Sequence, residues 1–183
     1  AAMPRGNLHL SFGLPLAAAA LTLGNLFGRF YIPASYHYGH LVADGSHPML
    51  DHLLSTESTQ MIHDGAGATR VKKTLAIAGW TVVHSRLRVC FRGARYSPHE
   101  GFFRNCGRCE KCLRTMIPLD IIGQTSRFPT FPSNVSFRDI KRVRYLSPSS
   151  RAFAMENLRL ARARGRWDMV FALAYGVVRG KLL

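Results

Sequence analysis

The sequence predicts an α/β protein that ends in a helical segment, and three observations lead to this prediction. Apolar helical stretches alternate with short strand-like runs through the first two thirds of the chain. The last third contains two helical patterns and no strand pattern. With 183 residues, 47% hydrophobic and 19% charged, the chain has the composition of a globular protein with its own core.

A helix followed by a strand is expected near the start of the chain. Residues 14–27 read LPLAAAALTLGNLF and predict a buried helix, and residues 30–32 predict a short buried strand that Pro33 ends. The apolar stretch is shorter than the roughly 20 residues that a membrane-spanning helix requires. It also lacks a small-residue cleavage pattern on its C-terminal side. We therefore expect neither a transmembrane segment nor a secretion signal.

The middle of the chain is expected to contain loops, one helix and one strand. Residues 35–63 are polar and rich in turn-forming residues, so they predict loops with a short helix over 48–54. An apolar stripe at i, i+3, i+7 and i+10 predicts a helix over 64–79. Alternating apolar residues over 86–91 predict a second strand.

Helices are expected in the remainder of the chain. One is predicted over 110–122, where Pro118 would kink or shorten it. Two more are predicted over 151–164 and 166–179, the first with separate apolar and basic faces and the second apolar nearly all round.

The four cysteines carry the strongest chemical signal. Cys106, Cys109 and Cys112 follow a C-x2-C-x2-C spacing, and the predicted strand brings Cys90 toward them. This crowding is unsuited to a disulfide framework and fits a cytoplasmic, metal-binding protein. Four thiolates can hold one zinc ion in a tetrahedron with Zn–S bonds of about 2.3 Å, so we predict a structural zinc site. An iron–sulfur cluster is the alternative, although the C-x3-C-P continuation of bacterial ferredoxins is missing, and free thiols remain a third possibility.

The chain is strongly basic, with 25 Lys and Arg against 10 Asp and Glu and a formal net charge of +15. A field of this sign attracts nucleic acid, nucleotide phosphates and anionic lipid. The predicted helix over 151–164 and its end form a basic face with Arg151, Arg159, Arg162 and Arg166. This face suggests contacts with nucleic-acid phosphates or with an anionic membrane surface. A solvated helix face is the simpler interpretation, and arginine-rich coding explains the charge equally well.

Residues 87–90 read Leu-Arg-Val-Cys, and residues 105–114 read Asn-Cys-Gly-Arg-Cys-Glu-Lys-Cys-Leu-Arg. This arrangement resembles the C-terminal zinc region of the 7-cyano-7-deazaguanine synthase family and related PP-loop ATP pyrophosphatases. Over roughly residues 10–125 the chain also looks like uncharacterised bacterial proteins of the adenine nucleotide alpha-hydrolase-like superfamily. The short segments that carry this wider likeness are YIPAS at 31–35, GSHP at 45–48, STE at 55–57 and HDG at 63–65.

The resemblance implies a partial Rossmann-like (HUP-type) parallel sheet over residues 1–125, with a zinc loop over 90–112 and a helical C-terminal extension over 126–183. It also implies an enzyme that binds ATP with Mg²⁺ and activates a carboxylate or similar group by adenylation, with the zinc in a structural role. The family's nucleotide site uses an S-G-G-x-D-S loop, and this sequence has no such motif. We therefore expect an N-terminally truncated or degenerate homologue that needs an upstream segment to use ATP.

The resemblance also indicates which loop residues would lie near a nucleotide or an acceptor substrate. They are Ser35, Tyr36, His47, Ser55, Thr56, Glu57, His63, Asp64 and Arg70. For each of them alone, a turn, cap or solvent-facing role is the simpler interpretation. Two other functions stay open at this point: a zinc-stabilised basic module that binds nucleic acid, and a scaffold at the membrane periphery.

Overall fold

The computed structural model describes residues 8–90 and 95–180 and has a mixed α/β fold. The chain divides into two compact units, which meet in the sequence between Thr69 and Arg70. The boundary predicted at residue 125 is of another kind, because it divides a family domain from an extension. The division of the chain into compact units does not test it. None of the helices in the described residues is long and apolar enough to cross a membrane.

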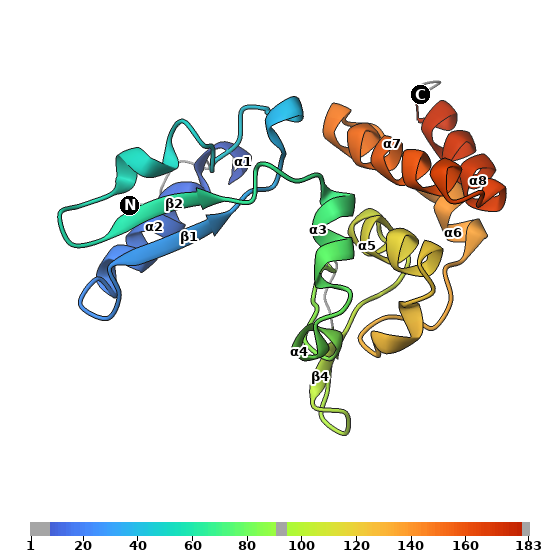
Figure 1. Cartoon of the computed structure of the whole chain (residues 1–183), viewed down its shortest axis with the longest axis horizontal. Helices are drawn as coiled ribbons and strands as arrows, with labels where there is room; N and C mark the ends of the chain where they lie inside the picture. The colour runs from blue at the N-terminus through green and yellow to red at the C-terminus, as the bar shows by residue number, and fades with distance from the viewer. Residues whose placement is uncertain (1–7, 91–94, 181–183) are drawn as a thin grey trace, which may run out of the picture. The chain divides into compact units, whose positions relative to one another are not determined.

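The N-terminal unit contains a pair of parallel strands (Figure 1). Its elements are α1 (Leu8–Ser11), α2 (Gly13–Thr22), β1 (Arg29–Pro33) and β2 (Gln60–Asp64). The register of the pair runs from Arg29 opposite Gln60 to Pro33 opposite Asp64. The predicted strand over 30–32 is therefore confirmed as part of β1.

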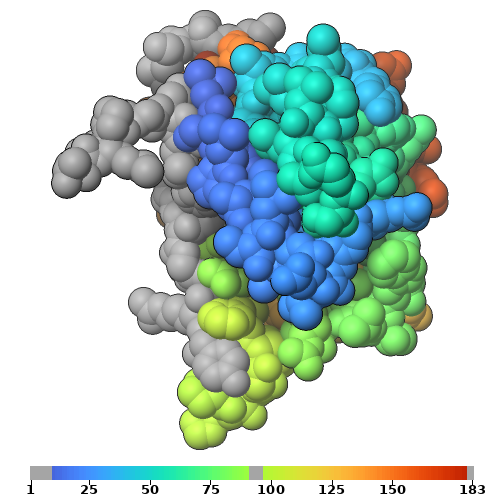
Figure 2. Space-filling model, turned by 90° about the vertical axis from the view of Figure 1, so that its left-hand side faces the viewer, coloured from blue at the N-terminus to red at the C-terminus, as the bar shows by residue number. Residues whose placement is uncertain are grey.

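Helix α2 covers the strand pair with its small side chains. Ala17 and Ala20 are buried against Met61 of β2, and Leu54 from the connection between the strands packs beside them. Figure 2 shows α2 in blue next to the teal segment that precedes β2. At the start of the helix a Cβ on Gly13 would lie 1.8 Å from the carbonyl oxygen of Gly45, so this close approach requires glycine.

The connection between β1 and β2 is mostly loop, as predicted, with two 3₁₀ turns, η1 (Tyr38–His40) and η2 (Asp51–Leu54). Strand β2 was not predicted, because residues 60–64 had been assigned to a loop and to the start of a helix. Asp64 still pairs with Pro33, and Gly65 then turns the chain with a φ of 80°. The helix predicted over 64–79 consequently begins only at Arg70.

Helix α5 lies at the centre of the C-terminal unit, where it packs against α3 and α7, while α8 packs against α6 and α7 (Figure 1). The helices are α3 (Arg70–Ile77), α4 (Thr81–His84), α5 (Glu110–Ile121), α6 (Phe137–Arg142), α7 (Pro148–Ala163) and α8 (Trp167–Arg179). A 3₁₀ turn, η3 (Thr125–Arg127), and an antiparallel pair, β3 (Arg95–Ser97) and β4 (Phe102–Arg104), complete the unit.

The core of this unit is built around α5. Met116, Ile117 and Leu119 are fully buried in one apolar cluster with Leu173 of α8. Pro118 stays inside the helix, although it lacks the N–H that would bond to the carbonyl oxygen of Arg114. The side-chain amide of Asn157 from α7 donates to that oxygen at 3.3 Å. This tertiary hydrogen bond replaces the missing helical one.

Of the other elements predicted in the C-terminal unit, the two terminal helices are confirmed and the strand is wrong. The two terminal helices are confirmed as α7 and α8, and α7 begins earlier because Ser147 caps it and Pro148 occupies its first turn. The strand predicted over 86–91 is wrong for residues 86–90, which form no strand, and residue 91 lies outside the described residues. Helix α6 was not predicted, since it has only 6 residues.

Candidate metal centre

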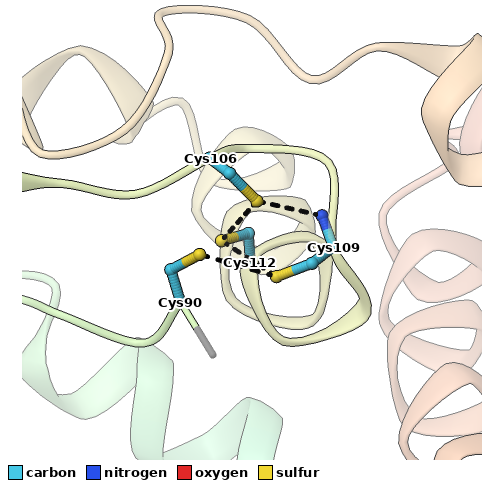
Figure 3. A group of neighbouring side chains, drawn as sticks. All are labelled: Cys90, Cys106, Cys109 and Cys112. Carbon is cyan, nitrogen blue, oxygen red and sulfur yellow. Dashed lines mark hydrogen bonds between the residues drawn. The ribbon is translucent and has the colours of Figure 1, made fainter. Parts of the chain in front are cut away.

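The four cysteines converge on one point in the C-terminal unit. Their Sγ atoms all lie within 4.8 Å of one another, and Figure 3 shows them facing a common space. Sulfur separations are 3.4 Å for Cys109–Cys112, 3.8 Å for Cys106–Cys112 and 4.0 Å for Cys90–Cys109. None of the four forms a disulfide. A tetrahedral ion with bonds of about 2.3 Å places its sulfurs about 3.8 Å apart, so the cluster can hold a metal ion.

Helix α5 and the turn before it supply three of the four sulfurs. Cys109 is the N-cap of α5 and Cys112 lies in its first turn, while Cys106 stands before the turn. Gly107 makes this turn with a φ of 71°, and a Cβ there would lie 2.4 Å from the side chain of Pro132. Both the backbone angle and the close contact therefore require glycine between the first two cysteines.

Asn105 places the fourth cysteine. Its side-chain oxygen accepts hydrogen bonds from the backbone N–H groups of Val89 at 2.9 Å and Cys90 at 3.0 Å. Its side-chain nitrogen donates to the carbonyl oxygens of Leu87 at 2.9 Å and Thr130 at 3.3 Å. The segment that was predicted as a strand is thus held by one buried amide rather than by a neighbouring strand.

The cysteine thiols differ in pKa because their surroundings differ. Burial by itself raises the pKa of Cys106, but hydrogen bonds from the backbone N–H groups of Arg108 and Cys109 outweigh it and lower the pKa to about 7. Burial raises the pKa of Cys109, and it raises the pKa of the fully buried Cys112 far more. In this arrangement Cys106 is therefore the thiol with the lowered pKa, and deprotonated thiolates are the form that binds metals.

Alkylation of the metal-bound protein under native conditions should follow the exposure of the cysteines. Cys106 is partly exposed, so we expect it to react with iodoacetamide before Cys112, whose side chain is fully buried. Peptide mass spectrometry after short pulses measures the order, with urea-unfolded protein as the control in which the rates converge. Equal rates in the native protein would contradict the arrangement of the site.

The structure gathers some of the predicted loop residues and not others. Ser35, Tyr36, His47 and His63 line one narrow space in the N-terminal unit, which is too small to hold a water molecule. The hydroxyl of Ser55 accepts from the N–H of Met61 at 2.9 Å. The remaining predicted residues lie outside this space: Thr56 and Glu57 in an exposed turn, Asp64 at the end of β2 and Arg70 in the C-terminal unit.

The group that organises this space was not predicted from the sequence. Asp51 is fully buried, and its Oδ2 accepts from the hydroxyl of Ser46 at 2.7 Å and from Nδ1 of His63 at 2.6 Å. Its Oδ1 accepts from the N–H of His47 at 3.0 Å. Nε2 of His63 is buried and has no hydrogen-bond partner among the described residues. An aspartate in a polar loop gives no sequence signal of such burial, because the imidazole that it binds comes from β2, a strand that was not predicted.

Asp51→Ala should destabilise the N-terminal unit by roughly 3 kcal/mol, because it leaves the imidazole, the hydroxyl and one N–H without their buried acceptor. Thermal unfolding followed by circular dichroism measures the change. Asp64→Ala removes an exposed carboxylate from the same unit and should change stability by less than about 0.5 kcal/mol. If both variants melt alike, Asp51 does not organise the loop.

Comparisons of the chain with protein-family models, with curated proteins and with solved structures find no match in any of the three.

Proposed function

We propose that the chain is the zinc-binding portion of a PP-loop type, ATP-dependent adenylating enzyme, in which the zinc has a structural role. The observation that carries the proposal is the convergence of four cysteine sulfurs within 4.8 Å of one another. Such a site requires reduced thiols, so the proposal places the protein in the cytoplasm.

The geometry of the sulfurs favours one zinc ion over an iron–sulfur cluster. All sulfur separations are within 4.8 Å, and three of them are 3.4–4.0 Å, which fits four ligands on a single ion. In a four-iron cluster each cysteine binds a different iron and the cluster occupies the space between the ligands, so the sulfurs stand farther apart. Four thiolates also fill a zinc ion's coordination and leave no position for water or substrate, which supports a structural rather than a catalytic ion.

The N-terminal unit supports the ATP-dependent part of the proposal. A helix precedes a pair of parallel strands in it, an arrangement that occurs in open α/β sheets of nucleotide-binding proteins. The sequence lacks the S-G-G-x-D-S loop, so the proposal assigns binding of ATP and Mg²⁺ to an upstream segment. By itself, the chain is expected not to hydrolyse ATP.

Sequencing the native polypeptide tests this proposal. The protein is captured from its source cells with an antibody raised against this chain and is analysed by intact mass and peptide sequencing. A longer polypeptide with an S-G-G-x-D-S segment ahead of α1 would support the assignment. A native polypeptide without that segment would contradict the enzyme assignment while leaving the zinc site untouched.

A further inference from the structure

A cavity of about 850 Å³ lies beside the cysteine cluster, within the C-terminal unit. Cys106, Cys109 and the start of α5 form one side of it, and the end of α6 with the residues that follow forms the other. The charged side chains that line it are Arg108, Glu110, Lys111, Asp139, Arg142 and Arg144. Its volume falls within the range of small-molecule sites.

Part of this charge is balanced locally. Glu110 is held by Arg114, whose Nε donates to it at 2.9 Å, so this carboxylate already has a cation of its own outside the cavity lining. Arg108 and Lys111 flank Cys109 in the sequence, and they offset the two negative charges of a zinc ion bound by four thiolates. The metal site therefore accounts for these two cations.

The opposite wall carries cations that the metal site does not explain. Arg142 and Arg144 line this wall and are exposed, and Asp139 is the carboxylate among its lining residues. Among the described residues, neither Arg142 nor Arg144 forms an ion pair with a carboxylate. Two guanidinium groups that line one concave surface are suited to phosphate oxygens, which they bind with paired hydrogen bonds.

The basic face that the sequence suggested is a weaker candidate. Arg166 binds Asp120 at 3.0 Å and Asp168 at 2.8 Å, so its charge is used within the protein. Arg151 donates to the carbonyl oxygen of Leu146 at 3.3 Å. Only Arg159 and Arg162 of that face remain exposed without such contacts among the described residues.

We propose that the cavity between α5 and α6 binds the phosphate groups of a nucleotide or a nucleic acid, through Arg142 and Arg144. This inference goes beyond the zinc site and does not rest on the PP-loop assignment. The phosphate chemistry is common to both ligands, and competition between them identifies which one the cavity prefers.

The test compares two double variants that remove the same charge from the C-terminal unit. The first variant combines Arg142→Ala with Arg144→Ala and removes both arginines from the cavity wall. The second combines Arg159→Ala with Arg162→Ala and removes two exposed cations of α7. Fluorescence anisotropy measures binding of a labelled single-stranded RNA oligonucleotide over a series of salt concentrations, and ATP serves as the competitor. Metal content and circular dichroism confirm that both variants are folded.

The cavity variant should bind the oligonucleotide roughly tenfold more weakly, with a salt slope that is smaller by about two, while the α7 variant stays close to the parent. Displacement of the oligonucleotide by ATP would identify a nucleotide as the ligand, and failure of ATP to displace it would identify nucleic acid. Equal losses in the two variants would show a diffuse basic field and overturn the proposal. So would an unchanged affinity in the cavity variant, or a parent protein that binds neither the oligonucleotide nor, by isothermal titration calorimetry, ATP.

Discussion

Replacing Cys112 with serine is expected to abolish metal binding and to unfold the C-terminal unit. Cys112 is fully buried, and its sulfur lies 3.4 Å from that of Cys109 and 3.8 Å from that of Cys106. Structural zinc contributes about 10–16 kcal/mol in zinc-finger peptides, which equals or exceeds the total stability of a typical domain. Metal analysis and near-UV circular dichroism of the purified variant measure the two effects.

Met116→Leu is the matched control for this experiment. Met116 is also fully buried on α5, one turn beyond Cys112, and the swap conserves volume at a cost below about 1.5 kcal/mol. This variant should keep its metal and its fold. A Cys112→Ser protein that retains full metal content and native ellipticity would show that the sulfur of Cys112 is dispensable.

Asn105→Ala should strongly destabilise the C-terminal unit. The amide makes four hydrogen bonds to backbone groups of residues 87–90 and Thr130, and Asn105 is 5% exposed. Removing it leaves two buried N–H groups and two carbonyl groups without that partner, so we expect a loss of about 3 kcal/mol or more in the free energy of unfolding. Cys90 should also lose its fixed position, which weakens metal affinity.

Asn134→Ala provides the comparison, because Asn134 is an exposed residue of the same type in the same unit. It should change stability by less than about 0.5 kcal/mol and leave metal affinity unchanged. Urea unfolding measures stability, and competition with a chromogenic chelator measures affinity. If Asn105→Ala behaves like Asn134→Ala on both measures, another group positions Cys90.

The parts of the fold that the sequence predicted are those with local signals. The 12 residues of α5 show a clear helical pattern and the helix begins directly after Cys109, so its bounds were predicted to within one residue. The close cysteine spacing likewise indicated that Cys106, Cys109 and Cys112 converge, and the structure confirms their convergence with Cys90. A cysteine spacing is informative because the turn that brings the thiols together lies within the motif.

The missed features depend on partners that are distant in the sequence. Strand β2 buries Met61 only because β1 and α2 lie against it, and its own residues alternate too weakly to indicate a strand. Asn105 and Asp51 are polar residues whose burial becomes evident only when their partners are known. Arg142 and Arg144 face the cysteine cluster through the cavity because of the path of the chain after α5, which no motif encodes.

Metal analysis of the protein tests the central claim most directly. The chain is purified under reducing conditions without added metal, its zinc and iron are quantified by mass spectrometry, and the bound ion is then exchanged for Co²⁺. We predict one zinc ion per chain, no visible absorption before exchange, and the strong absorption of tetrahedral cobalt thiolate after it. Stoichiometric iron with broad visible absorption, or a folded protein without any metal, would contradict the four-thiolate zinc site.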